Sequence, residues 1–193
     1  RAVEIAGIGH SAERLPENVR PNMYELMAGK NAAAKAYAEA GIKASDIDFA
    51  EVHDCFTINQ ILCTEALGLS EDGRGGFDYL DGRFTRDDRV AVNLSGGLKS
   101  KGHPVGATGA SMHALAYKQL IGEPIGVAAK KAEIGVVYNV GGSSVTNCVT
   151  VLKALESFRQ QAADLAFVVN EFGSLEGIVA LKDLMEAIAG EFP

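Results

Sequence analysis

The sequence predicts a layered α/β domain, with a mixed sheet covered by helices, followed by a small hairpin and helix. Short β-branched runs alternate with longer stretches rich in alanine and leucine, an order typical of helices packed on a sheet. Hydrophobic residues make up 47% of the 193 residues, which is enough for a packed core. Glycines stand where the helical stretches stop.

The first elements are predicted from their periodicity and their stop signals. Apolar residues that cluster or alternate favour strands, and stretches rich in Ala, Leu, Met and Lys favour helices. Gly41 and Gly68 are placed to end the two helices. The predicted elements are a strand at 2–8, a helix at 24–41, a strand at 47–52 and a helix at 57–67.

The middle of the chain begins with a charged, glycine-rich segment at 69–90, which predicts an excursion over the surface. The stretch 93–109 then runs into a helical pattern that reaches about Leu120. Two β-branched runs follow at 135–139 and 143–152, and the Gly141-Gly142 pair between them predicts a hairpin. Strand, helix, strand, helix, loop, helix, strand and strand together predict the mixed sheet.

The last part of the chain has a different character. Residues 155–164 are polar and predict a linker, so the expected boundaries are a domain at 1–154, the linker, and a segment at 165–193. That segment has the pattern of a hairpin and a helix. It is too small to bury a core of its own, so we expect it to dock on another surface.

Charge and composition exclude several classes of partner and location. A net charge of −7 without a basic run disfavours nucleic acid as a partner, and no segment is long and apolar enough for a membrane span. Three cysteines with unmatched spacing indicate a reducing compartment, so we expect a cytoplasmic location. The chain starts without Met in a strand-like run, which suggests a piece of a longer protein whose original address is lost.

The stretch Asn93 to Gly109 packs five glycines around His103. Pro104 suits the first helical position, so we expect a helix to begin directly behind the histidine, where free N–H groups favour a developing negative oxygen. A phosphate-binding loop is disfavoured because His103-Pro104 stands where Lys and Ser or Thr should follow. A glycine-rich turn with an incidental histidine is the alternative that these residues leave open.

A second candidate site, His53-Asp54-Cys55-Phe56, follows a predicted strand. A thiol and two imidazoles that converge would suit nucleophilic or proton-transfer chemistry. Each residue also has a structural interpretation, since Cys55 could be an inert core cysteine and Asp54 a helix cap. A zinc site made of His53, Cys55, Cys63 and His103 fits the composition but lacks paired ligand spacing, so no metal is expected.

Three motifs in chain order resemble the C-terminal half of the thiolase superfamily, most closely the sterol-carrier-protein, lipid-transfer type. They are Glu51-Val-His-Asp-Cys-Phe56, the stretch Asn93 to Gly109 with its Gly-His-Pro, and Asn139-Val-Gly-Gly-Ser-Ser144. The resemblance covers about residues 1–154 and implies a thiolase-like layered half-domain. It also implies an acyltransferase that makes or cleaves a carbon–carbon bond beside an acyl-CoA thioester, with coenzyme A thioester as substrate and no further cofactor.

The resemblance also implies catalytic roles. His103 would activate the nucleophilic cysteine and hold the thioester oxygen, His53 would complete an oxyanion site for the enolate, and Cys55 would move a proton at the α carbon. Donors aimed at that oxygen are worth about a hundredfold or more in rate. Substrate-binding positions implied by the motifs are Phe56, Asn93, Gly97, Gly141 and Gly142.

Two departures from the family pattern matter. Val140 stands where many thiolases have a cysteine, which fits the subfamily that uses Cys55 instead. The nucleophilic cysteine belongs to the N-terminal half of the fold, and neither Cys63 nor Cys148 has a matching context. The isolated chain is therefore expected to lack the acylation step and to need an N-terminal half, or a homo-oligomer, as its partner.

Other interpretations stay open at this stage. The chain could be a noncatalytic scaffold or assembly subunit of thiolase fold, or a retro-aldolase of the lipid-transfer kind. The tail at 165–193 resembles the closing half of a CBS domain, although Ala180-Leu-Lys-Asp183 departs from the nucleotide-binding pattern. The junction between the thiolase-like part and this tail is equally compatible with a fragment, a chimaera and a natural regulatory tail.

Overall fold

The structure is a computed structural model that describes residues 2–14, 20, 22, 24–155, 165–169 and 175–180. The chain forms two compact units. One comprises Ala2–Ala154, and the other comprises Leu155–Pro193 together with Arg1.

The larger unit is built on a five-stranded sheet with the order β1-β5-β4-β2-β3. β2 runs parallel to β3 and to β4, whereas β5 is antiparallel to both β4 and β1. This arrangement confirms the predicted mixed sheet. The strands are β1 (Val3–Ala12), β2 (Phe49–Val52), β3 (Ala91–Val92), β4 (Ile134–Gly141) and β5 (Thr146–Ala154).

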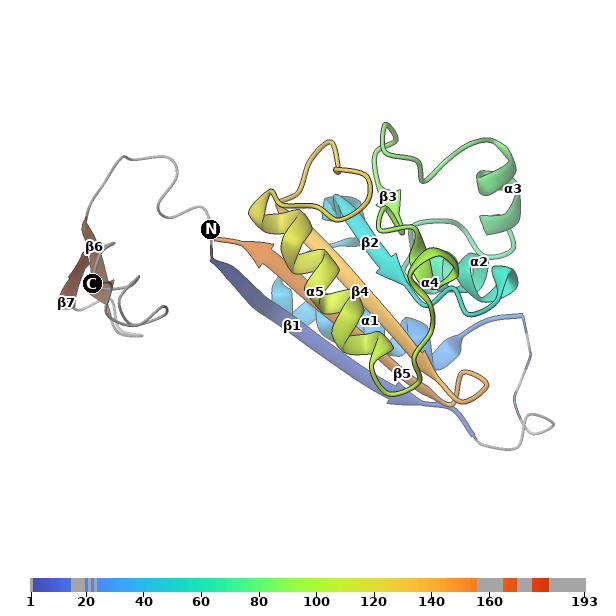
Figure 1. Cartoon of the computed structure of the whole chain (residues 1–193). Coiled ribbons are helices and arrows are strands. Elements are labelled where there is room, and N and C mark those ends of the chain that lie inside the picture. The colour runs from blue at the N-terminus through green and yellow to red at the C-terminus, as the bar shows by residue number, and fades with distance from the viewer. Residues whose placement is uncertain are drawn as a thin grey trace. The chain divides into compact units, whose positions relative to one another are not determined.

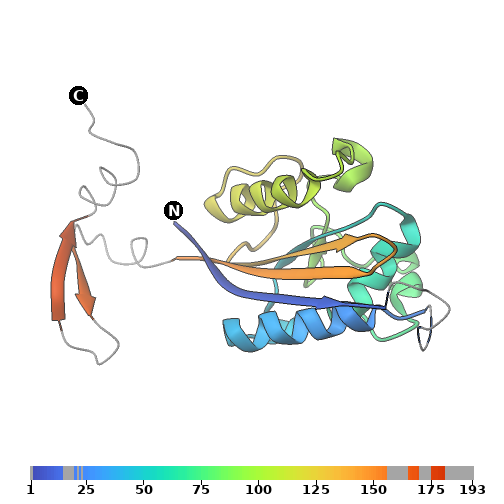
Figure 2. The same ribbon diagram turned by 90° about the horizontal axis from the view of Figure 1, so that it is seen from below.

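Helices cover both faces of this sheet, which gives three layers (Figures 1 and 2). α1 (Met27–Ala40) packs on one face together with α2 (Thr57–Ala66), and α5 (Thr108–Ile121) packs on the other. Each face therefore has its own hydrophobic core. The remaining helices are short: a 3-10 turn at Ala44–Asp46, α3 (Gly75–Leu80) and α4 (Gly97–Lys101).

Close packing between α1 and the edge strand β1 depends on small residues. A Cβ atom added at Gly9 would lie 1.8 Å from the carbonyl oxygen of Ala32, and one at Gly7 would lie 2.3 Å from that of Ala36. The glycines of the strand therefore let the alanine face of the helix approach to backbone contact. As predicted, α1 ends at Gly41, which adopts the left-handed conformation with φ 63°.

The segment 69–90 differs in part from its predicted form. It contains α3, and its apolar side chains Leu69, Phe84 and Val90 are buried in the core on the α1 face. The segment thus runs over the surface, as predicted, but these three side chains anchor it to the domain. The three buried residues could not be recognised in the sequence, because they are widely spaced among charged residues and glycines and form no apolar run.

The helix expected directly behind His103 begins five residues later, at Thr108. Pro104 opens a turn, in which its carbonyl oxygen accepts hydrogen bonds from the backbone N–H groups of Ala107 and Thr108 at 2.9 and 3.1 Å. The cause is Gly106, whose φ of 89° has no place in a right-handed helix. The prediction that placed the start of the helix at Pro104 is therefore wrong.

The smaller unit contains the predicted hairpin, because β6 (Leu165–Val169) pairs antiparallel with β7 (Leu175–Ala180). The helix predicted to follow the hairpin lies outside the described residues. Within the described parts of the chain, no helix has both the length and the apolar character that crossing a membrane requires.

Candidate active site

The candidate active site lies at the edge of the sheet where the parallel strands β2 and β4 end. Val52 of β2 is in register with Tyr138 of β4, so the residues that follow each strand meet at one edge, the usual place for a ligand in such a sheet. A cavity of about 840 Å³ opens there. Its lining includes His53, Cys55 and Phe56 after β2, His103 from the Gly-His-Pro turn, and Gly141 and Gly142 after β4.

The two histidines are in direct ring contact. The ring centroids of His53 and His103 lie 4.9 Å apart, and the ring planes are nearly perpendicular at 82°. His53 is 5% exposed, whereas His103 stands in an exposed turn. The fold thus brings together the two imidazoles that the sequence motifs singled out.

Burial controls the protonation of His53. It lowers the pKa of the imidazole, and the positive charge that His103 can carry lowers it further, while Asp54 and Asn139 partly offset the shift. The Nδ1 atom of His53 is buried and has no hydrogen-bond partner among the described residues. At neutral pH the ring is therefore uncharged, and its Nδ1 atom can donate or accept one further hydrogen bond.

Cys55 and Cys63 occupy different environments. Burial raises the pKa of the Cys55 thiol, although backbone N–H groups partly offset the shift, so the thiol stays protonated at neutral pH beside the cavity. Cys63 is fully buried on α2, and burial raises its pKa strongly. Cys63 is thus a core residue, and all three cysteines of the chain are free thiols.

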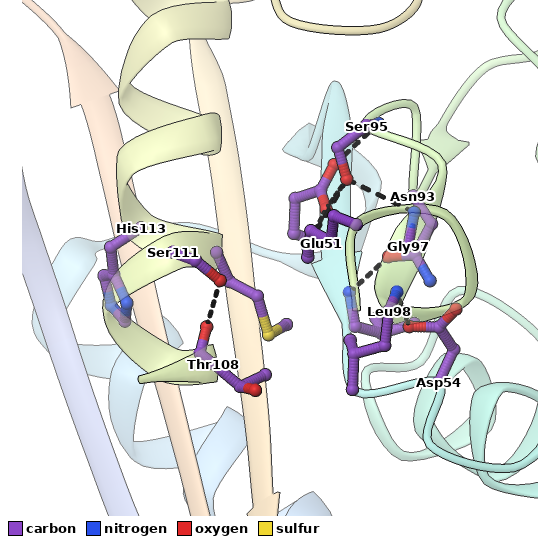
Figure 3. A network of polar contacts seen from close by, with 12 residues as sticks. Glu51, Asp54, Asn93, Ser95, Gly97, Leu98, Thr108, Ser111 and His113 are labelled. Atoms are coloured by element: carbon purple, nitrogen blue, oxygen red, sulfur yellow. Dashed lines mark hydrogen bonds and ion pairs between the residues drawn. The ribbon is translucent and has the colours of Figure 1, made fainter. Parts of the chain in front are cut away.

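Asp54 and Glu51 hold the loop that leads to His103, as Figure 3 shows. Asp54 accepts a hydrogen bond from the backbone N–H of Leu98 at 2.8 Å. Glu51, which is 1% exposed, accepts hydrogen bonds from Ser95 Oγ at 2.6 Å and from Ser95 N at 3.2 Å. The Nζ atom of Lys101 lies 3.5 Å from the same carboxylate.

Burial is the main influence on Glu51 and raises the pKa of its carboxyl group, while the bonds from Ser95 and the charge of Lys101 lower it. The two acids and His53 all come from one short segment of chain at the end of β2. That segment therefore supplies one catalytic candidate and also fixes the position of the other.

The predicted substrate-binding residues fall into two groups. Phe56, Gly141 and Gly142 line the cavity. Asn93 and Gly97 lie outside its lining and support the loop instead, since Asn93 Oδ1 accepts a hydrogen bond from Val52 N at 2.8 Å and Gly97 packs against Asp54. The role of all five in binding substrate stays a prediction.

Sequence reasoning overlooked two residues of the site. Glu51 opens the first family motif but has no predicted role, although a carboxylate inside an apolar run is itself a signal of a buried polar contact. Thr108 was treated only as part of the glycine motif, yet its Oγ1 lies 2.7 Å from His103 Nδ1. Among the described residues, no three His, Cys, Asp or Glu side chains are grouped as metal ligands.

Residues 9–154 match the protein family described as "Thiolase C-terminal domain-like". The chain is 44% identical over 132 residues to an acetyl-CoA acetyltransferase of Methanothermobacter thermautotrophicus, a match that covers 68% of this chain and 34% of that protein. It is 41% identical over 168 residues to human sterol carrier protein 2, which covers 84% of this chain and 30% of the relative. The chain thus spans about a third of the length of these relatives.

Solved structures support the layered fold. The Ltp2–ChsH2(DUF35) aldolase superposes with a TM-score of 0.69 at 20% identity, covering 79% of this chain and 39% of that one. A monomeric SCP2-thiolase-like protein from Mycobacterium smegmatis gives a TM-score of 0.57 at 22% identity, over 79% of this chain and 29% of its own. These likenesses confirm the predicted thiolase-like fold. The family match ends at Ala154 and gives no support to a CBS-like tail.

Proposed function

Because the chain belongs to the thiolase C-terminal domain-like family, we propose that it is the C-terminal catalytic half of an acyl-CoA acyltransferase that forms or cleaves a carbon–carbon bond beside a thioester. The observation that carries this proposal is the contact between His53 and His103 at 4.9 Å on the wall of a cavity that Cys55 also lines. A scaffold subunit would have no need for this grouping.

In the cleavage direction, each residue has a defined task. His103 takes the proton of a nucleophilic thiol, which attacks the keto carbon of the substrate and leaves an acyl group on the sulfur. The bond between the keto carbon and the α carbon breaks, and its electron pair goes to the thioester enolate. His53 and His103 donate hydrogen bonds to the enolate oxygen, which is where negative charge accumulates.

Cys55 completes the proposed step by giving its proton to the α carbon. Its raised pKa suits this task, because the thiol is protonated at neutral pH and can act as a general acid. In the condensation direction the same sulfur must first lose its proton. The acyl group on the nucleophilic sulfur is finally transferred to the thiol of coenzyme A. The proton of that thiol returns to Cys55, and His103 gives its proton back to the nucleophilic sulfur, so the site returns to its initial state.

The attacking thiol must come from outside this chain. Cys63 is fully buried, Cys148 lies on β5 outside the cavity lining, and Cys55 is assigned to proton transfer in this scheme. We therefore propose that an N-terminal thiolase half supplies this thiol. Another copy in a homo-oligomer has the same three cysteines, so it would complete the walls of the site without providing the nucleophile. Three large apolar side chains that line the cavity are exposed, which fits a surface that a partner or an acyl chain covers: Phe56 at 72%, Ile58 at 58% and Val105 at 91%. The free cysteines agree with the cytoplasmic location that belongs to the same proposal.

Complementation tests the proposal. The 193-residue chain is mixed with the N-terminal half of the Methanothermobacter acetyl-CoA acetyltransferase, complex formation is followed by size exclusion, and thiolysis of acetoacetyl-CoA is measured. We expect activity in the complex, a loss of at least about a hundredfold with His103→Ala, and no loss with His10→Ala, a histidine on β1 that the cavity lining does not include.

Two outcomes would contradict the proposal. Full activity of the His103→Ala complex would remove the catalytic assignment. A complex that forms but stays inactive, while the relative's own two halves recombine into an active enzyme, would favour the noncatalytic scaffold.

A further inference from the structure

We propose that Thr108 is a positioning residue that holds His103 in the tautomer with hydrogen on Nδ1, so that Nε2 is the nitrogen that accepts a proton. The catalytic meaning of this inference rests on the proposed function. The tautomer itself is a property of the chain alone and can be measured without any activity.

The hydrogen bonds of the Thr108 hydroxyl carry the inference. Its Oγ1 donates to the carbonyl oxygen of Pro104 at 3.1 Å and lies 2.7 Å from Nδ1 of His103. A hydroxyl has a single hydrogen but two lone pairs. A hydrogen directed to the ring would leave the lone pair on Nδ1. The geometry instead assigns that hydrogen to the carbonyl oxygen of Pro104, which can only accept, so Nδ1 is assigned as the donor in the contact with the ring. In the neutral ring, the lone pair then lies on Nε2.

Burial and backbone contacts fix the position of Thr108. The residue is 3% exposed, so water does not compete for its hydroxyl. It is also the first residue of α5, a helix fixed to the sheet by the fully buried Met112 and Ala116. Ser111 Oγ donates to the carbonyl oxygen of Thr108 at 2.8 Å and ties down the same turn (Figure 3).

The turn between His103 and Thr108 brings the imidazole into hydrogen-bond distance of the threonine. Gly102 and Gly106 adopt φ of 86° and 89°, which few other residues tolerate. They fold the chain so that the imidazole returns over the first residue of the helix. The delayed start of α5 thus has a function, because a helix that began at Pro104 would leave His103 without this partner.

The tautomer matters for the proposed chemistry in both protonation states. With hydrogen on Nδ1, the neutral ring presents the Nε2 lone pair as a base. Once Nε2 has taken a proton, both ring nitrogens are donors, and the Thr108 oxygen still accepts from Nδ1. The hydrogen bond from Nδ1 to Thr108 therefore holds the ring both when it is a neutral base and when it is a protonated donor.

Nuclear magnetic resonance of the 15N-histidine-labelled chain tests the inference directly. Long-range proton–nitrogen correlations identify the hydrogen-bearing nitrogen of each of the four histidines, and His103→Gln assigns the signal. At a pH high enough to neutralise the ring, we expect His103 to carry its hydrogen on Nδ1. A wild-type spectrum with hydrogen mainly on Nε2 would overturn the inference by itself.

Variants then establish the role of the hydroxyl. Thr108→Val should shift His103 toward the Nε2–H form that free imidazole side chains favour, whereas Thr108→Ser should keep the wild-type tautomer. Ser111→Ala is the matched control, since it removes a hydroxyl from the same turn without contact to the ring. An unchanged tautomer in Thr108→Val, in a chain with native chemical shifts elsewhere, would contradict the proposal. Thr108→Ala replaces that variant if the valine prevents folding.

The complemented enzyme gives the functional readout. We expect Thr108→Val to lower kcat about tenfold, the effect of one lost hydrogen bond, and Thr108→Ser to restore it. If the complementation itself fails, the proposed function is in doubt, but the tautomer measurement still decides the assignment of Thr108.

Discussion

Gly97→Ala should be strongly destabilising, because two independent effects act at this residue. Gly97 has φ 64°, and a left-handed backbone costs an alanine roughly 1–2 kcal/mol. An added Cβ would also lie 2.1 Å from Oδ2 of Asp54, so that carboxylate must move away. Losing its hydrogen bond from Leu98 N costs about 1.5–3 kcal/mol. The expected total is about 2.5–5 kcal/mol.

A matched variant separates the two effects. Gly73 has a similar φ of 74° but no atom within 4 Å of an added Cβ. Gly73→Ala should therefore cost only the backbone part, roughly 1–2 kcal/mol. Urea unfolding followed by far-ultraviolet circular dichroism gives both free energies of unfolding.

A double-mutant cycle completes the test. In an Asp54→Ala background the clash is absent, so Gly97→Ala should again cost only roughly 1–2 kcal/mol, and the two substitutions should be non-additive by about 1.5–3 kcal/mol. If Gly97→Ala were no more harmful than Gly73→Ala, or if its cost were the same with and without Asp54, the reasoning about this loop would be refuted.

Three further predictions concern other parts of the domain. Burial raises the pKa of Glu51, so the folded protein retains a proton that the unfolded chain releases. The free energy of unfolding of the wild type, relative to that of Glu51→Gln, should therefore rise as the pH falls from about 7 to about 5. Urea titrations in which that difference stays constant would contradict this. Burial also raises the pKa of Cys55 and of Cys63, so iodoacetamide near neutral pH should alkylate Cys55 slowly and Cys63 only after unfolding. Equal alkylation rates of the two cysteines in the native protein, measured by peptide mass spectrometry, would contradict this. Gly9→Ala places a Cβ 1.8 Å from the oxygen of Ala32 and should cost about 3 kcal/mol in the same unfolding assay, whereas a loss below about 1 kcal/mol would mean that α1 shifts freely.

The sequence predicted features that depend on local chemistry. Gly41 ends a helix because few other residues adopt the left-handed conformation there, and the Gly141-Gly142 pair marks the hairpin between β4 and β5. The motif residues His53 and His103 were placed on the right loops because their neighbours resemble a known family. In each case the information lies within a few residues of the feature.

Contacts between distant segments could not be predicted in the same way. Glu51 and Ser95 are 44 residues apart, as are Asp54 and Leu98. The residues next to Glu51 in the sequence do not indicate that its carboxylate binds the loop around Ser95. The start of α5 was misjudged because Pro104 favours a helix start, whereas the conformation of Gly106 excludes the intervening residues from the helix.

The end of β2 imposes a restriction on how this protein could acquire new substrates. Residues 51–54 supply His53 and also brace the segment that presents His103, so a substitution there alters reactivity and geometry together. Side chains such as Ile58 and Leu62 on α2 border the cavity without taking part in the bracing. If the proposed function holds, changes in the size of the accepted acyl group should therefore arise on α2, and libraries intended to alter specificity are best confined to that helix.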